Sequence, residues 1–113
     1  MLSDRRSCQA VKIELLYFDG CPNFDRLLPR LEELVDEYAP GNRIELRRVE
    51  STAAAEQERF LGSPTVRVEG EDVEPSASAR SDFGLKCRLY RNGEQYVDIP
   101  AESWIVAALR RPG

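Results

Sequence analysis

The stretch Tyr17-Phe18-Asp19-Gly20-Cys21-Pro22-Asn23-Phe24 places a cysteine between a hydrophobic run and an amphipathic segment. The pattern predicts a strand, then a turn, then a helix that begins near Cys21. Unpaired backbone N–H groups and the positive end of the helix dipole would face the sulfur and favour thiolate over thiol. The stretch therefore predicts a reactive, solvent-accessible thiol at Cys21. A small buried cysteine that fills space at the end of the strand is the alternative.

The segments on either side alternate between the periodicities of strand and helix, which predicts an α/β fold. The order of strand, helix and strand favours a parallel pair, and a tight turn over 69–72 favours an antiparallel return. The expected elements are a strand over 11–18, a helix over 23–38 with Pro29 inside it, a strand over 43–49 with Leu46 on or near the core side, a helix over 52–61, a strand over 66–68, a return strand through Val73, a hairpin of 87–91 and 95–98, and a last helix that Pro100 opens.

Composition bounds the class of protein. The chain has 113 residues, of which 42% are hydrophobic and 32% charged, as in a folded globular domain. We expect a flexible polar extension over 1–10 and a single domain over 11–113. The net charge of −4 comes with scattered basic residues, which gives no nucleic-acid footprint. No apolar run approaches the roughly 18 residues of a membrane helix. With no export signal, a cytoplasmic location is expected.

The sequence contains no histidine, so His-assisted thiol hydrolases, imidazole zinc sites and Ser-His-Asp triads are excluded. Three cysteines remain as the chemically distinctive side chains. Besides Cys21 these are Cys8, which we interpret as an incidental thiol of the extension, and Cys87. In the predicted topology, the return strand through Val73 runs back toward the end of the sheet where Cys21 lies, so the loop that follows it should emerge near Cys21. Cys87 would then either serve the site or be a core-facing residue of the later hairpin, and Lys86 and Arg88 would favour its thiolate if exposed.

The order of elements resembles that of the thioredoxin and glutaredoxin superfamily. Three features carry the resemblance: Cys21-Pro22-Asn23-Phe24 at the position of that superfamily's CxxC, Pro29 eight residues after Cys21, and Ser63-Pro64-Thr65 at the start of the third strand, where the superfamily has its cis-proline. The resemblance implies a thioredoxin-like βαβαββα three-layer sandwich with a β-hairpin inserted before the last helix. It also implies a cis peptide bond before Pro64.

The same resemblance implies a thiol–disulfide redox site without a cofactor, acting on a thiol or disulfide of a protein or small molecule. Cys21 would be the nucleophile. Ser63 and Pro64 would form an exposed backbone edge that binds substrate, with Pro22 and Phe24 beside it. Phe24 stands where the resolving cysteine would be, so the motif is a monothiol variant of CxxC, and a mixed disulfide would need a thiol from elsewhere to resolve it. Cys87 is the candidate.

The stretches 17–22, 62–68 and 83–88 together resemble a small bacterial thioredoxin-like family. Some of its members are called DF-family (seleno)proteins and others alkylmercury-lyase-like. The first label implies redox use of a chalcogen. The second implies two cysteines and an acid, for which Cys21, Cys87 and Asp19 are available, although Asp19 is also an ordinary turn residue.

Three functions therefore follow from the sequence. The favoured one is thiol–disulfide redox chemistry, with Cys21 as nucleophile and Cys87 as the candidate resolving thiol. The second is binding of a soft metal or an organomercurial by the same two cysteines, because paired thiolates select thiophilic ions. The third is a non-catalytic thioredoxin-fold module that binds a protein partner, in which Cys21 has no chemical role.

Overall fold

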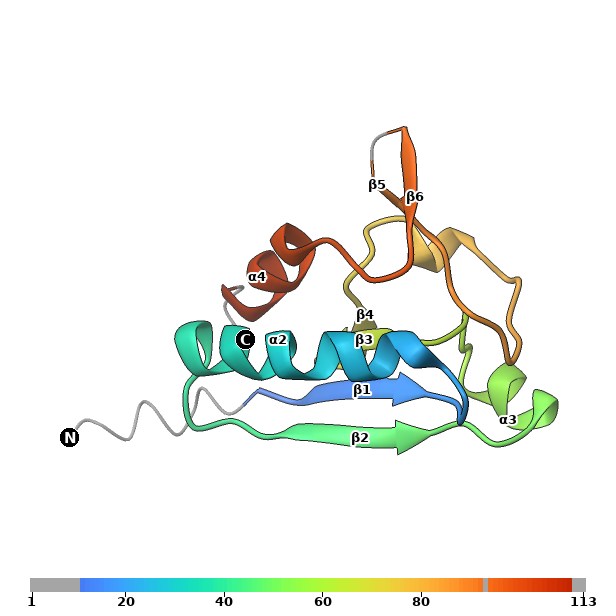
Figure 1. Ribbon diagram of the computed structural model, residues 1–113, viewed down its shortest axis with the longest axis horizontal. Helices are drawn as coiled ribbons and strands as arrows, with labels where there is room; N and C mark the ends of the chain where they lie inside the picture. Colours follow the sequence, from blue (N-terminus) through green and yellow to red (C-terminus); the bar gives the residue numbers. More distant parts are fainter. Residues whose placement is uncertain (1–10, 93, 111–113) are drawn as a thin grey trace.

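Strand β1 (Ile13–Tyr17) lies inside a mixed four-stranded sheet in this computed structural model, which describes residues 11–92 and 94–110 (Figure 1). The strand order is β2-β1-β3-β4. Parallel pairing joins β1 to β2, whereas β1–β3 and β3–β4 are antiparallel. The other strands of the sheet are β2 (Ile44–Arg48), β3 (Thr65–Val68) and β4 (Glu71–Asp72).

Side chains of β1 alternate between the two faces of the sheet, and both faces bury apolar residues. Ile13 and Leu15 belong to the larger core, which is formed with α2 (Pro22–Tyr38) and α4 (Glu102–Arg110). These two helices lie on the same side of the sheet in Figure 1. Leu16 faces the opposite way and packs with Ala55 of α3 (Thr52–Gln57) and with Phe60. The molecule is therefore an α/β domain with helices on both faces of its sheet.

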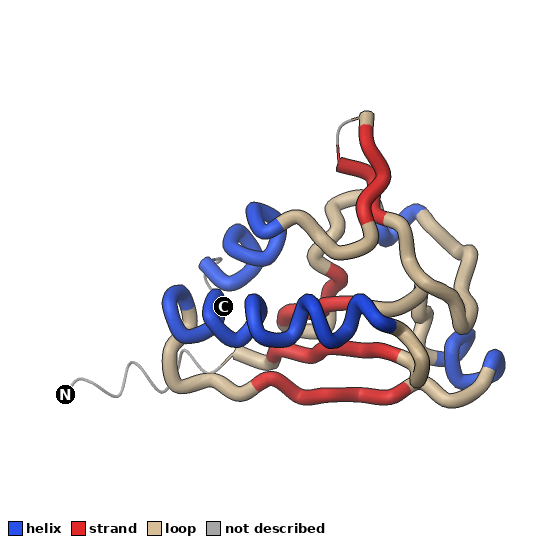
Figure 2. Tube along the Cα trace, viewed as in Figure 1, coloured by secondary structure: helices blue, strands red, loops and turns tan. Residues whose placement is uncertain are grey.

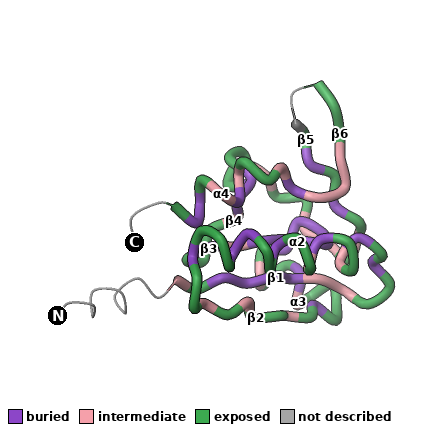
Figure 3. The backbone as a smooth tube through the Cα atoms, turned by 60° about the vertical axis from the view of Figure 1, so that its left-hand side comes forward, coloured by how far each residue is buried: buried purple, intermediate pink, exposed green. Residues whose placement is uncertain are grey.

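The remaining chain between the sheet and α4 forms a second, smaller unit. A 3-10 turn, η1 (Ala77–Ala79), interrupts a long connection after β4. Strands β5 (Tyr90–Asn92) and β6 (Gln95–Val97) then pair antiparallel as a separate two-stranded sheet. This hairpin projects away from the main sheet (Figure 2) and is largely exposed, in contrast to β1 (Figure 3).

The short helix α3 ends earlier than the expected boundary at residue 61. Ser51 caps its start, since the Ala54 N–H donates to the Ser51 hydroxyl at 3.0 Å. After Gln57, Arg59 takes a left-handed conformation with φ of 56°. The Phe60 N–H then donates to the Ala55 carbonyl at 2.8 Å, which is the closing bond of a Schellman motif. The helix stops because this turn buries Phe60 under the sheet.

Two other expectations were wrong in detail. Pro100 precedes α4 instead of opening it, and the Ala101 carbonyl accepts the first helical hydrogen bonds, from Trp104 and Ile105. Leu46 is 49% exposed, because β2 is an edge strand and its side chains extend past the cover of α2.

Among the described residues, no helix is both long and apolar enough to cross a membrane.

Leu31 and Leu46 provide a matched test of where the core lies. Leu31 is completely buried between α2 and the sheet, so Leu31→Ala should lower the free energy of unfolding by about 2–5 kcal/mol. Leu46→Ala removes the same atoms from an exposed site and should cost roughly 0.5 kcal/mol or less. Urea unfolding of both variants measures the difference, and equal losses would contradict this arrangement of the core.

Candidate functional site

Cys21 is the residue that joins β1 to α2. It is the N-cap of the helix in an extended conformation, and Pro22 follows it in the first turn. Gly20 makes the preceding turn with φ of +93°, and the Cys21 N–H donates to the Phe18 carbonyl at 3.4 Å. The sequence therefore placed Cys21 correctly at the start of the helix.

The expected solvent accessibility of Cys21 was wrong. The residue is only 6% exposed. Its thiol donates to the backbone carbonyl of Ser63 at 3.6 Å, so the sulfur faces the loop that precedes β3. Two other parts of the chain lie against the sulfur. They are this loop and the segment around Cys87. Burial here is thus a consequence of tertiary packing that the local pattern around Cys21 does not encode.

The loop before β3 is built around a cis peptide bond between Ser63 and Pro64, the isomer expected from the sequence. Ser63 is fully buried. Its N–H donates to the Lys86 carbonyl at 2.8 Å, and its own carbonyl accepts from the Arg88 N–H at 2.9 Å. These bonds form an isolated parallel bridge between Ser63 and Cys87. The backbone edge that we expected to be open for a substrate is therefore occupied by the chain itself.

Gly62 makes the close approach of the two segments possible. A Cβ atom built on Gly62 would lie 2.9 Å from the Cβ of Arg88 and 3.0 Å from the Lys86 carbonyl oxygen. Its φ of +125° is also a conformation that other residues rarely adopt. Only glycine therefore fits between the loop before β3 and residues 86–88.

Cys87 lies in an extended segment before the hairpin, and not in the hairpin itself. Burial alternates along residues 85–90: Arg88 and Tyr90 are buried, while Leu85, Cys87 and Leu89 are exposed. This period of two is that of a strand with one buried face. Cys87 belongs to the outward set, so the alternative of a core-facing cysteine was wrong.

The Cys87 thiol interacts with Cys21. Loss of surrounding water raises its pKa, and so do the negative charge of the Cys21 sulfur, a hydrogen bond between the two side chains, and the charge of Asp98. A negative charge on the Cys21 sulfur therefore disfavours the thiolate of Cys87, and the two side chains interact electrostatically. Both cysteines are free thiols.

The basic neighbours of Cys87 do not favour its thiolate, contrary to expectation. Lys86 pairs with Asp82 at 2.8 Å. Arg88 is completely buried and points away from solvent. Its guanidinium reaches acceptors in β3, in β4 and in the connection that follows. These are Thr65 (2.8 Å), Asp72 (2.7 and 3.1 Å) and Glu74 (2.7 Å).

Charge and packing both hold Arg88 in this position. Burial opposes its positive charge, but Tyr90 and the carboxylates of Asp72 and Glu74 outweigh it and raise the pKa of the guanidinium. The guanidinium carbon lies 4.3 Å from the centre of the Tyr90 ring. Tyr90 is also fully buried and donates its hydroxyl to the Pro64 carbonyl. Residues 88 and 90 thus anchor the segment to both sides of the cis peptide.

The other sequence-predicted site residues frame Cys21. Pro22 is exposed at the start of α2. The ring of Phe24 stacks on Tyr17 with centroids 4.2 Å apart, so the position of a CxxC resolving cysteine is filled by an aromatic contact. Asp19 lies in the turn and pairs with Arg48 at 3.0 Å, which supports its interpretation as a turn residue. Cys8 lies outside the described residues.

Sequence reasoning missed the residues that hold the site together: Gly62, Arg88, Tyr90 and the two carboxylates that Arg88 binds. The alternation of residues 85–90 in the sequence points the other way, because its apolar positions Leu85, Cys87 and Leu89 are the exposed set in the structure. An arginine on the buried face of an extended segment is rare unless it is paired, so no local pattern marks Arg88 as the inward residue. Arg88 lies on that face because Asp72 and Glu74 come back beside β3 after the turn.

Comparison with known proteins does not extend this description. No protein-family model matches the chain, and no curated protein or solved structure matches it at a significant level.

The coupling of the two sulfurs predicts how the reactivity of Cys87 depends on pH. Replacing Cys21 by serine removes a negative charge and a hydrogen bond that raise the pKa of Cys87, so the pKa should fall. The rate of Cys87 alkylation by iodoacetamide should then reach half of its plateau at a lower pH. The measurement follows the alkylated Cys87 peptide by mass spectrometry, in a Cys8→Ser background.

Asp98→Asn is the matched control, since Asp98 is the smallest of the causes that raise the pKa of Cys87. Its alkylation profile should shift in the same direction as that of Cys21→Ser but by less. A Cys21→Ser profile that coincides with the parent profile would show that the two thiols do not interact.

Proposed function

We propose that this chain is a thiol–disulfide redox protein in which Cys21 and Cys87 form the redox pair. The observation that carries the proposal is the backbone bridge of Ser63 to residues 86–88, which brings the segment of Cys87 to the carbonyl that the Cys21 thiol contacts. A second thiol at this place supplies what the sequence around Cys21 lacks, because Phe24 occupies the usual resolving position.

A thioredoxin-like architecture is part of the proposal. It is supported by the strand order β2-β1-β3-β4 with its parallel and antiparallel pairs, and by a cysteine at the start of the helix after β1. The cis peptide bond directly before β3 is a third supporting observation. The long connection between β4 and β5 then carries the second thiol, so the redox pair is assembled from two distant segments, and the roles proposed below are the reverse of those expected from the sequence.

The chemistry is an exchange that conserves atoms and electrons. The Cys87 thiolate attacks an external disulfide, forms a mixed disulfide and releases one thiolate. The Cys21 thiolate then attacks the Cys87 sulfur, forms the Cys21–Cys87 disulfide and releases the second thiolate. The protein dithiol loses two electrons and two protons, and the external disulfide becomes two thiols.

The exposures of the two sulfurs assign their roles. Cys87 is exposed and Cys21 is 6% exposed, so Cys87 exchanges with external reagents while Cys21 is the nucleophile of the internal step. In the reverse direction an external thiolate attacks Cys87, and Cys21 leaves.

Mild oxidation tests the proposal. Oxidation of the Cys8→Ser chain with an excess of a small acyclic disulfide, bis(2-hydroxyethyl) disulfide, should form one intramolecular disulfide between the peptides that contain Cys21 and Cys87, detected by peptide mass spectrometry. Cys21→Ser and Cys87→Ser should each abolish it, because neither remaining thiol has its partner. An absent Cys21–Cys87 link, or a disulfide that requires Cys8, would overturn the pairing.

The same pair of thiols also supports the soft-metal alternative. Two sulfurs side by side suit a two-coordinate thiophilic ion such as Hg(II). Within residues 11–92 and 94–110, no group of three or more metal-binding side chains is arranged around an ion position, so a third protein ligand is not indicated.

Hg(II) titration separates the two functions. One ion bound per chain, with loss of binding in both single Cys→Ser variants and no reduction of an external disulfide to two thiols, would favour the metal function. Reduction of an external disulfide to two thiols that both variants abolish favours the redox function. The titration is followed by the absorbance of the mercury–thiolate bond.

A further inference from the structure

We propose that residues 86–88 act as a built-in substrate strand: they occupy the backbone edge beside the redox pair, so that the external partner is a small-molecule disulfide and not an extended polypeptide. The inference rests on the proposed redox function and names its class of substrate. Four observations carry it: the occupied backbone groups, the close packing, the buried charge and the cavity beside Cys87.

The backbone edge next to Cys21 has no hydrogen-bonding capacity left for a peptide. An extended chain binds a strand edge through free N–H and C=O groups. The N–H of Ser63 is used by the Lys86 carbonyl, and the carbonyl of Ser63 accepts from both Arg88 and the Cys21 thiol. A substrate strand would have to displace residues 86–88 before it could pair with Ser63.

Close packing makes this displacement costly. Gly62 admits Arg88 and Lys86 at distances that any Cβ would prevent. Upstream, the Gly84 N–H donates to the Phe60 carbonyl at 3.0 Å, so the segment is attached before the bridge as well. The edge is therefore closed by contacts at Phe60, Gly62 and Ser63, and not by a single hydrogen bond.

Buried charge anchors the segment on its other side. Arg88 is held by Asp72, Glu74 and Thr65, and the hydroxyl of Tyr90 by the Pro64 carbonyl. Withdrawing the segment would leave Asp72 without its guanidinium partner and Glu74 with Arg80 alone, and loss of one member of such a cluster is strongly unfavourable. Residues 86–88 thus differ from a loose flap that a polypeptide could push aside.

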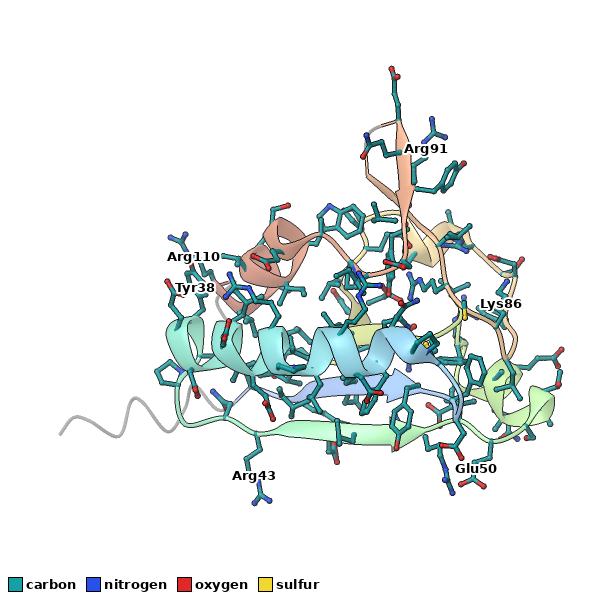
Figure 4. All side chains as sticks on the ribbon, viewed as in Figure 1. Tyr38, Arg43, Glu50, Lys86, Arg91 and Arg110 are labelled. Carbon is teal, nitrogen blue, oxygen red and sulfur yellow. The ribbon has the colours of Figure 1, made fainter. Side chains whose placement is uncertain are left out.

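The exposed cysteine, Cys87, lines a small cavity. Cys87 lines a hollow of about 500 Å3, together with Leu61, Lys86, Leu89 and Tyr96. This volume falls in the range of small-molecule sites. The hollow lies between the connection after β4 and the hairpin, where Lys86 and Arg91 are seen in Figure 4. A small disulfide can reach Cys87 here without touching the closed edge.

The electron balance is that of the exchange above. Cys87 attacks the small disulfide RSSR and one RS⁻ leaves. Cys21 then displaces the second RS⁻ from Cys87. A polypeptide disulfide undergoes the same chemistry but gains no backbone pairing at Ser63, so its binding cannot compensate for its bulk.

The experiment compares two disulfides with the same leaving group, using the full chain with Cys8→Ser. One is bis(2-hydroxyethyl) disulfide. The other is a ten-residue single-cysteine peptide joined to 2-mercaptoethanol. With the edge closed, the peptide gains no backbone hydrogen bonds that would compensate for its bulk, so the reduced protein should react with the small disulfide about tenfold faster or more. An open edge would add one or two backbone hydrogen bonds to the peptide and reverse this order. A peptide that reacts faster, with saturation, overturns the inference.

Amide hydrogen exchange examines the edge directly. The N–H groups of Ser63 and Arg88 should exchange as slowly as amides inside the main sheet, with and without the peptide. Rapid exchange at these two amides would show an open edge. This measurement does not depend on redox activity, so it separates failure of the inference from failure of the proposed function, which would appear as no reaction with either disulfide.

Gly62→Ala should open the edge, and Gly41→Ala is its matched control. Both glycines have positive φ, +125° and +88°, so both substitutions add backbone strain, but a Cβ on Gly41 has nothing within 4 Å. Gly62→Ala should raise the ratio of peptide to small-disulfide rates by roughly tenfold, and Gly41→Ala should leave it unchanged. Equal ratios for the two folded variants would overturn the inference. If Gly62→Ala does not fold, the comparison on the parent chain and its amide exchange decide.

Discussion

The pairing of the Ser63 backbone with residues 86–88 is the interaction on which the rest of the site depends. It fixes the distance between the start of β3 and the connection after β4, and it sets which side of that connection faces inward. Cys21 meets the same carbonyl from the start of α2. Three segments that are separate in sequence therefore share one peptide group, and the chemistry of the site follows from what each segment presents there.

Buried charge stabilises this arrangement at a considerable desolvation cost. Arg88 lies inside the molecule with Asp72 and Glu74, and such a cluster is favourable only while its members remain hydrogen-bonded to one another. The cluster thus specifies position more than it adds stability. Replacing any member would loosen the segment that carries Cys87, while β1, β2 and α2 would keep the core that Leu31 and Leu15 fill.

The sequence predicted the elements well where periodicity and turn residues agree. The strand before Cys21, the amphipathic helix after it and the hairpin of β5 and β6 all follow from local patterns. Boundaries were less certain where tertiary packing decides them: α3 ends early because Phe60 turns into the core, and Leu46 is exposed because β2 is an edge. The positions of Cys21 and of the cis peptide were predicted. The burial of Cys21, the exposure of Cys87 and the inward arginine depend on contacts between distant segments, which no local pattern of this chain contains.

The separation of Cys21 and Cys87 along the chain has a consequence for the lifetime of the protein. A covalent link between them would close a loop through most of the domain, and the chain-entropy model assigns such a loop roughly 4 kcal/mol of added stability. The globally unfolded form, which proteases cleave, would become about a thousandfold rarer in the oxidised state. Oxidation would then slow degradation of the chain, so that the amount of the protein in a cell would rise with the ratio of disulfides to thiols around it.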